Sequence, residues 1–382
     1  MTEAERERIL RILLAASLFL AASFAWRWFS DPEPLFPDVF GFWTFGQVAL
    51  GPAPASLYDT PGLYALQHGL GMPEENGGYP YPYPPWFMLA VAPLGWFAYP
   101  VAAALWRGVT AAFYGWAVRP APWLIALVAP ASIVSFVVGQ NGFLTAALMQ
   151  GGVRLLETRP VWAGALLGAV AYKPQFAVLI PCYLLFRGQW RAAGAAVVTA
   201  VALTLLSTAL FGPAIWPAWL ASMREQAGSL AAGRPAQLDH MATFTSAALL
   251  LGASRSAAHA VQAAAALFAL WALWRTRHGN NPAILAFATL TATPYAFGYD
   301  LPTTTGAALV LWAMPGPLPS RLVLLLTGVT MAPLLTTFGL GSWAATIPVL
   351  HALTLWALVI DQPLLASSPV SAKYRKSSGV LP

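Results

Sequence analysis

The chain has 382 residues, of which 58% are hydrophobic and only 9% are charged, and its formal net charge is +6. A typical soluble domain is about 25% charged, so this composition excludes a soluble globular protein. The basic residues are scattered singly between apolar runs and form no patch that could follow a phosphate backbone, which excludes a nucleic-acid partner.

The N-terminus carries Arg6, Arg8 and Arg11 before an apolar run from Ile12 to Phe29. This run is too long for the apolar region of an ordinary signal peptide, so it predicts an uncleaved first membrane span. With the later runs it predicts an all-α, polytopic transmembrane protein of about 10–12 membrane helices, each needing roughly 20 apolar residues. The runs lie near residues 9–29, 86–118, 122–139, 142–156, 161–186, 191–211, 256–274, 282–297, 303–314, 321–338 and 343–360.

Basic residues favour cytoplasmic loops, and this rule orients the chain. It predicts that both termini lie in the cytoplasm. We expect one domain over residues 1–365, a cytoplasmic tail over 366–382, and a location in the cell (inner) membrane. No Lys or Arg lies between Trp28 and Trp106, which predicts a first outer loop from about 30 to 85 and a second from about 212 to 243. The acids of the first outer loop are Asp31, Glu33, Asp38, Asp59, Glu74 and Glu75.

Asp38 lies among aromatic residues a few positions beyond the first span. A partly desolvated carboxylate has a raised pKa and can act as a general base. The alternative is that Asp38 only caps a helix over residues 39–50, since Asp is a good N-cap residue.

Two further outer segments carry side chains that suit sugars. Residues 78–85 alternate tyrosine with proline, and Tyr81 and Tyr83 offer flat faces for sugar rings. The alternative is an interfacial aromatic belt. Gln140 and Asn141 lie at the outer junction of two spans, where they can bind sugar hydroxyls or hydrogen-bond across helices.

Lys173 is the only lysine before the C-terminal tail, and it lies inside the apolar run 161–186, beside Pro174. Proline removes a backbone donor, so a broken helix is expected here, near the outer face. A charge at membrane depth is costly and indicates function. Its expected partner is an anion, either a phosphate or a carboxylate such as Asp38. The alternative is a side chain that reaches back to the interface.

Tyr299 and Asp300 end the run 282–297 on the outer side. Asp300 is either a second site carboxylate or the cap of a helix starting near Thr303. No phosphate-binding glycine motif and no metal-ligand spacing is present, and the single cysteine, Cys182, excludes an internal disulfide. We therefore expect no cofactor and no metal site.

Taken in order, these segments resemble glycosyltransferase family 87, whose members are membrane enzymes of the GT-C class. The resemblance covers about residues 9–300. It rests on Asp38 after one span, Ser56-Leu57-Tyr58-Asp59, Tyr83-Pro84-Pro85, Gly139-Gln140-Asn141 and Lys173-Pro174-Gln175. It implies an outward-facing active site, a polyprenyl-phosphate-linked sugar donor, usually mannose, and a lipid or glycan acceptor. On this resemblance, Asp38 matches the acid that acts on the acceptor hydroxyl. The segment lacks the DxD pattern, so the metal dependence of some GT-C oligosaccharyltransferases is not expected here.

A phosphate leaving group needs a fixed cation. The expected donor phosphate ligands are Lys173, Arg224, Arg234 and His240. The expected sugar and acceptor ligands are Tyr81, Tyr83, Gln140, Asn141, Gln175, Tyr299 and Asp300. Direct displacement would invert the anomeric centre. The second hypothesis is a transporter or lipid flippase, which would place its site at the bilayer midplane between related halves. A non-catalytic scaffold is the third, if Asp38 only caps a helix.

Overall fold

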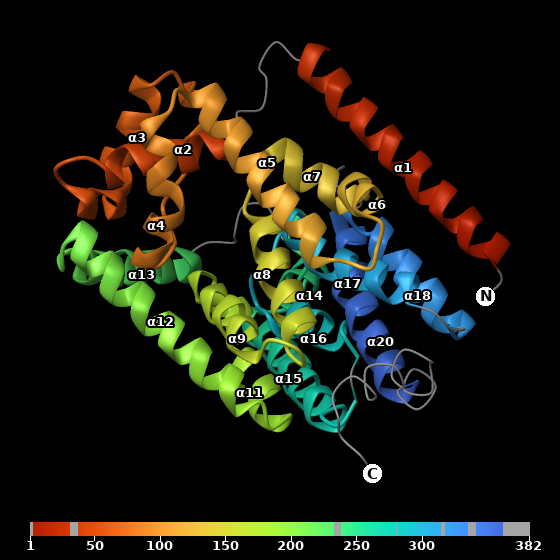
Figure 1. Ribbon diagram of the computed structural model, residues 1–382. Coiled ribbons are helices and arrows are strands. Elements are labelled where there is room, and N and C mark those ends of the chain that lie inside the picture. Colours follow the sequence, from red (N-terminus) through yellow and green to blue (C-terminus); the bar gives the residue numbers. More distant parts are fainter. Residues whose placement is uncertain are drawn as a thin grey trace.

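The computed structural model describes residues 3–30, 37–232, 238–279, 281–314, 318–334 and 341–361. Over these residues the chain is helical and contains no β-strand, so the predicted all-α class is confirmed (Figure 1). The α-helices are α1 (Glu3–Ser30), α2 (Val39–Ala49), α3 (Thr60–Gly69), α4 (Met88–Val91), α5 (Tyr99–Ala117), α6 (Trp123–Val128), α7 (Pro130–Val138), α8 (Gly142–Leu155), α9 (Pro160–Ala169), α10 (Pro174–Ala177), α11 (Ile180–Phe186), α12 (Trp190–Phe211), α13 (Ile215–Ala232), α14 (Phe244–Leu250), α15 (Arg255–Arg275), α16 (Ile284–Ala292), α17 (Pro302–Ala313), α18 (Ser320–Met331) and α20 (Thr346–Ile360). The 3₁₀ helices are η1 (Pro54–Tyr58), η2 (Glu74–Asn76), η3 (Pro85–Phe87), η4 (Ala92–Trp96), η5 (Val170–Tyr172), η6 (Leu238–His240), η7 (Gly298–Asp300) and η8 (Gly341–Ala345).

Three helical segments are long and apolar enough to cross a bilayer: Trp190–Phe211, Arg255–Arg275 and Ser342–Ile360. Only 6% of the apolar window of α12 is buried within the protein, as expected for a helix that faces lipid. Other apolar helices have 10–17 residues, which is short for a complete crossing. A helical membrane protein is therefore confirmed, whereas the number of crossings stays a prediction.

Prolines divide the two apolar runs that are awkward as simple spans. Residues 85–117 form η3, α4 and η4, followed by α5, which has Pro100 in its first turn. Residues 160–186 form α9, η5, α10 and α11, and Lys173 lies in the break, with φ −117° and ψ 85°, just before Pro174. The predicted break in this helix is confirmed, because a proline cannot continue the hydrogen-bond ladder of the preceding turn.

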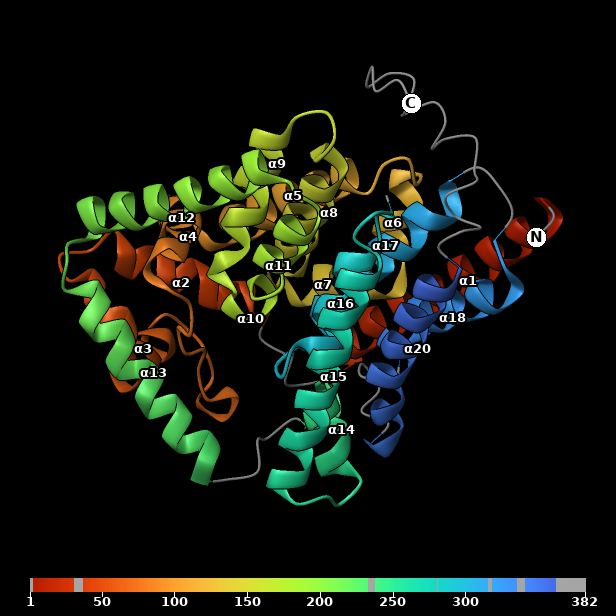
Figure 2. The same ribbon diagram turned by 90° about the horizontal axis from the view of Figure 1, so that it is seen from below.

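The two expected outer loops pack against each other. The helix α13 contacts η1 and η3 (Figure 2). The Trp86 and Trp216 rings lie 5.6 Å apart. Helix α2 is held to η4 by hydrogen bonds from Trp43 Nε1 to the Phe97 carbonyl, 2.9 Å, and from Gln47 Nε2 to the Gly95 carbonyl, 3.1 Å. Helix α2 and η4 are therefore parts of one packed unit.

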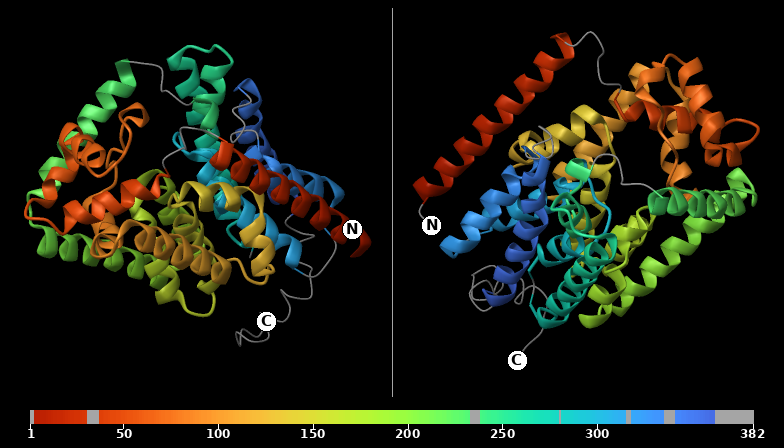
Figure 3. Two further views of the ribbon diagram at one scale, coloured as in Figure 1. Left: turned by 90° about the horizontal axis from the view of Figure 1, so that it is seen from above. Right: turned by 180° about the vertical axis from the view of Figure 1, so that it is seen from behind.

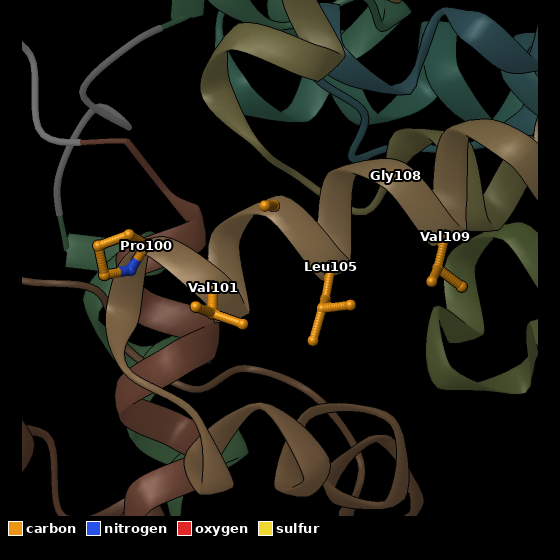
Figure 4. A pocket seen from close by; sticks show the side chains of 6 residues that line it. Pro100, Val101, Leu105, Gly108 and Val109 are labelled. Atoms are coloured by element: carbon orange, nitrogen blue, oxygen red, sulfur yellow. The ribbon is translucent and has the colours of Figure 1, made fainter.

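The middle of the molecule is formed by α8, α16 and α17, whose side chains are mostly buried. Helix α1 lies across the molecule from α2, α3 and α4, and it contacts α6, α7 and α18 (Figure 3). A shallow, open apolar groove lies along one face of α5, from which Val101, Leu105 and Val109 project (Figure 4). This groove is lined almost wholly by apolar atoms, as expected of a surface in lipid.

Candidate functional site

The Asp38 carboxylate lies at the start of α2 but does not cap that helix. Asp38 holds the N-cap position, with φ −57° and ψ −23°, and its side chain makes no capping hydrogen bond. Instead, Asp38 Oδ2 accepts a hydrogen bond from Gln140 Nε2 at 2.8 Å, and the Tyr79 side chain also hydrogen-bonds the carboxylate. The carboxylate is thus engaged by side chains from two distant parts of the chain.

The turn after α7 brings Gln140 to Asp38. Helix α7 ends at Gly139, which has φ +72°, a left-handed conformation that favours glycine. The turn also lies against α2, since a Cβ built on Gly139 would be 2.7 Å from the Val39 Cβ. Gln140 is oriented in turn by its neighbour, because its Oε1 accepts the Asn141 backbone N–H at 3.1 Å.

These surroundings make Asp38 a stronger base than an exposed aspartate. Burial raises the pKa of Asp38 from 3.8 to about 6, and the hydrogen bonds from Gln140 and Tyr79 lower it in part. A carboxyl group with this pKa is mostly ionised at neutral pH, yet it binds a proton more readily than an ordinary aspartate. The arrangement suits a general base.

The tyrosine–proline segment forms a buried aromatic cluster beside Asp38. Tyr81 is 1% exposed and Tyr83 is 8% exposed. The Tyr81 ring lies 5.0 Å from Phe45, and the Tyr83 ring lies 4.3 Å from Phe87. The Tyr83 hydroxyl accepts a hydrogen bond from Asn141 Nδ2 at 2.8 Å. The segment is therefore packed inside the protein, unlike an interfacial belt, and both predicted sugar-stacking rings are covered in this structure.

Lys173 forms a buried ion pair with Asp300. The ammonium group contacts Asp300 Oδ1, and the two side chains are 5% and 3% exposed. The ammonium group also lies 5.3 Å from the Phe176 ring and 5.4 Å from the Tyr299 ring. The carboxylate partner of Lys173 is therefore Asp300, where the sequence had suggested Asp38 as an example.

Asp300 does not supply the cap of α17 that was one alternative, since Leu301 holds that N-cap position and no side chain caps it. Asp300 ends η7 just before α17, and its Oδ2 accepts the Phe297 backbone N–H at 3.1 Å while Oδ1 contacts Lys173. A Cβ built on Gly142 would lie 1.8 Å from the Tyr299 carbonyl oxygen, so the start of α8 touches this turn. The turn with Gln140 and the turn with Asp300 thus lie side by side.

A hydrogen bond also joins Asn141 to the break in the helix at Lys173. The Tyr172 hydroxyl donates to the Asn141 carbonyl at 3.3 Å. Direct contacts and adjacent residues therefore link Asp38, Gln140 and Asn141 to the Lys173–Asp300 pair. Gln175, two residues after Lys173, is half-buried at the start of α10.

The remaining predicted phosphate ligands belong to the expected second outer loop, residues 212–243. Arg224 is exposed on α13, and Arg234 lies outside the described residues. His240 Nε2 lies 3.9 Å from Asp239 Oδ1, and its side chain is 46% exposed. Arg224 and His240 have the accessibility that a lipid-linked phosphate needs, in contrast to the paired Lys173.

The structure adds Arg107, which the sequence analysis did not select. Arg107 lies on α5 and donates from Nε to the Phe136 carbonyl at 2.8 Å and from Nη2 to the Val137 carbonyl at 3.1 Å. A single basic residue in an apolar run was the available signal, the same one that drew attention to Lys173.

Comparison with protein families matches residues 81–297 to the model of glycosyltransferase family 87, which is more than half of the 382 residues. The chain belongs to this family. It is therefore a membrane glycosyltransferase, with a sugar donor and an acceptor as its substrates. Comparisons with curated proteins and with solved structures gave no match.

The family 87 match contains Gln140 and Lys173 but begins after Asp38 and ends just before Asp300. The role of Asp38 in this family 87 member therefore rests on its geometry and surroundings. Within the described residues, no group of three or more His, Cys, Asp or Glu residues could hold a metal ion. The expectation that this enzyme needs no cofactor stays a prediction.

Proposed function

We propose that this family 87 member transfers a hexose, most simply mannose, from a polyprenyl-phosphate donor to a lipid or glycan acceptor. The reaction takes place on the non-cytoplasmic face, with Asp38 as general base. One observation carries the proposal. The Asp38 carboxylate makes no capping bond to α2 and is held at 2.8 Å by Gln140 from the junction of α7 and α8.

The reaction is a single displacement at the anomeric carbon. The acceptor oxygen forms a bond to this carbon while the bond from the carbon to the phosphate oxygen breaks. The acceptor proton moves to an Asp38 carboxylate oxygen, and the polyprenyl phosphate leaves with the electron pair. Attack opposite the leaving group inverts the anomeric configuration.

The leaving phosphate gains charge and needs a nearby cation. Arg224, Arg234 and His240 of the second outer loop are the proposed ligands, because this loop packs over the first one through α13. Lys173 was considered with them, but its charge is already balanced by Asp300. We assign Lys173 the role of holding the break in the helix beside Asn141, with Gln175 and Tyr299 left as sugar or acceptor contacts.

In the proposed topology, the protein lies in the cell (inner) membrane and both termini are in the cytoplasm. Two contacts support it. Arg187 donates hydrogen bonds to the carbonyls of Gly279 and Thr276, which joins two loops that carry the basic residues of the cytoplasmic side. Arg154 likewise donates to the Trp116 carbonyl at 2.7 Å, at the end of α5 that precedes Arg119.

Purified protein in liposomes tests transfer against the alternative of lipid movement. With radiolabelled polyprenyl-phosphate mannose and a membrane lipid extract as acceptor, we expect label to appear in a new glycolipid. A nucleotide-linked mannose should give no product. A flippase would move the labelled donor between leaflets without making a new covalent product, and that result would contradict the proposal.

A further inference from the structure

Arg107 carries a charge on a helix that is otherwise apolar, and such a charge is costly without acceptors. On the neighbouring face of α5, Val101, Leu105 and Val109 line the apolar groove (Figure 4). The Arg107 side chain is half-buried and turns to the backbone of α7. The guanidinium group of Arg107 therefore forms its hydrogen bonds within the protein.

The acceptors are the carbonyls at the C-terminal end of α7. The last four carbonyls of an α-helix have no partner within the helix. Arg107 Nε donates to the Phe136 carbonyl at 2.8 Å and Nη2 to the Val137 carbonyl at 3.1 Å. A cation at this end also interacts favourably with the helix dipole. Arg107 thus fixes the last turn of α7 from outside.

The residues after this turn lead directly to the candidate base. A Cβ built on Gly139 would lie 3.2 Å from Arg107 Nη2 and 2.7 Å from the Val39 Cβ, so the guanidinium, the turn and the start of α2 are in contact. Gln140 follows at once and donates to Asp38 at 2.8 Å. A shift of the end of α7 would therefore move the Gln140 side-chain amide, which holds the Asp38 carboxylate.

We infer that Arg107 is a positioning residue, which clamps the end of α7 so that Gln140 holds the Asp38 carboxylate in its working orientation. The effect on sugar transfer rests on the function proposed above, whereas the effect on Asp38 itself does not. Misplacing a reacting group by about 1 Å can cost roughly a hundredfold in rate. We therefore expect Arg107→Gln to lower kcat roughly ten- to a hundredfold.

Arg154 provides a matched control. It lies on α8, about 18 Å along the helix from Gly142 at a rise of about 1.5 Å per residue. It donates to the Trp116 carbonyl at 2.7 Å, in the last turn of α5, and its guanidinium lies 5.2 Å from the Trp116 ring. Arg154→Gln removes the same kind of contact between an arginine and a helix end, away from Asp38.

The titration of Asp38 is the readout that a merely structural role would not change. The Gln140 hydrogen bond lowers the pKa of Asp38, so its loss should raise that pKa and move the acid limb of the pH–rate profile to higher pH. Tyr79, Tyr83 and Tyr299 also interact electrostatically with Asp38. They are unchanged in every variant, and tyrosines ordinarily titrate near pH 10.

The experiment titrates the Asp38 carboxyl group by infrared spectroscopy, and the signal that is missing in Asp38→Asn identifies this group. The transfer rate and the melting temperature of each variant are measured as well. We expect Arg107→Gln and Gln140→Leu to raise the titration midpoint, the double variant to add little, and Arg154→Gln to leave it in place. Arg107→Lys, which keeps a cation able to reach one carbonyl, should give an intermediate shift and serves if Arg107→Gln fails to fold.

An unchanged Asp38 midpoint in both Arg107 variants would overturn the inference, even if transfer slowed. So would an unchanged midpoint in Gln140→Leu, because the link to Asp38 would then be absent. If the wild-type protein transferred no sugar from polyprenyl-phosphate mannose, the proposed function would fail, and the titration would still decide the role of Arg107.

Discussion

The Asp38→Asn variant is expected to lose most of the sugar-transfer activity while keeping a near-normal melting temperature. Removing a general base typically lowers a rate by about 10²- to 10⁴-fold. The fold should tolerate the change because the Asp38 side chain makes no capping bond to α2, and the Asn carbonyl oxygen can still accept from Gln140 Nε2. Initial transfer rates and detergent melting curves of purified protein check both parts.

Glu75→Gln is the control for this variant. Glu75 is an exposed acid in η2 and is not among the partners of Asp38, so its neutralisation removes one negative charge and leaves the Asp38–Gln140 contact in place. We expect wild-type transfer from this control. Wild-type rates in Asp38→Asn itself would remove Asp38 from the chemistry.

The second large effect is expected on stability, from Lys173→Met. The substitution leaves the Asp300 carboxylate buried without its cation. Breaking a buried ion pair from one side typically costs about 3–5 kcal/mol, so the melting temperature should fall markedly. A side chain that only reached to the interface would give a harmless variant, and a pure phosphate ligand would give a stable but inactive one.

A compensating variant makes this test specific. Asp300→Asn removes the charge but keeps an oxygen that can accept the Phe297 backbone N–H. Replacing both members of a buried pair by neutral groups is often close to neutral for stability. Lys173→Met with Asp300→Asn should therefore recover much of the lost melting temperature. If the double variant melted no higher than Lys173→Met alone, the pair would not be the source of the loss.

The fold class and the break at Lys173 could be predicted because their signals are local. Long apolar runs need a bilayer, and a proline interrupts a helix wherever the helix lies. The partner of Lys173 could not be predicted, since Asp300 is 127 residues away and the two residues meet only in the packed fold, where η7 lies against α7 and α8.

Two features of the site were also beyond the sequence. The tyrosine–proline pattern indicated flat aromatic faces but not which way they point, and Tyr81 proves to be buried against Phe45. The single charge of Arg107 in an apolar run was visible in the sequence, but its acceptors are the main-chain carbonyls of Phe136 and Val137, and such acceptors leave no mark in a sequence. Side chains that act through distant backbone become visible only when the helices are packed.

The central claim is that Asp38 is the base, and the pH dependence of transfer tests it most directly. Purified wild-type protein in liposomes is assayed with saturating polyprenyl-phosphate mannose between about pH 4.5 and about pH 8, a range set around the pKa of Asp38, which burial raises to about 6. Protonated Asp38 cannot accept the acceptor proton, so the rate should rise with pH, reach half its maximum at about pH 6 and then level off. A rate nearly independent of pH over this range, as a base with the ordinary aspartate pKa of about 3.9 would give, would contradict the account.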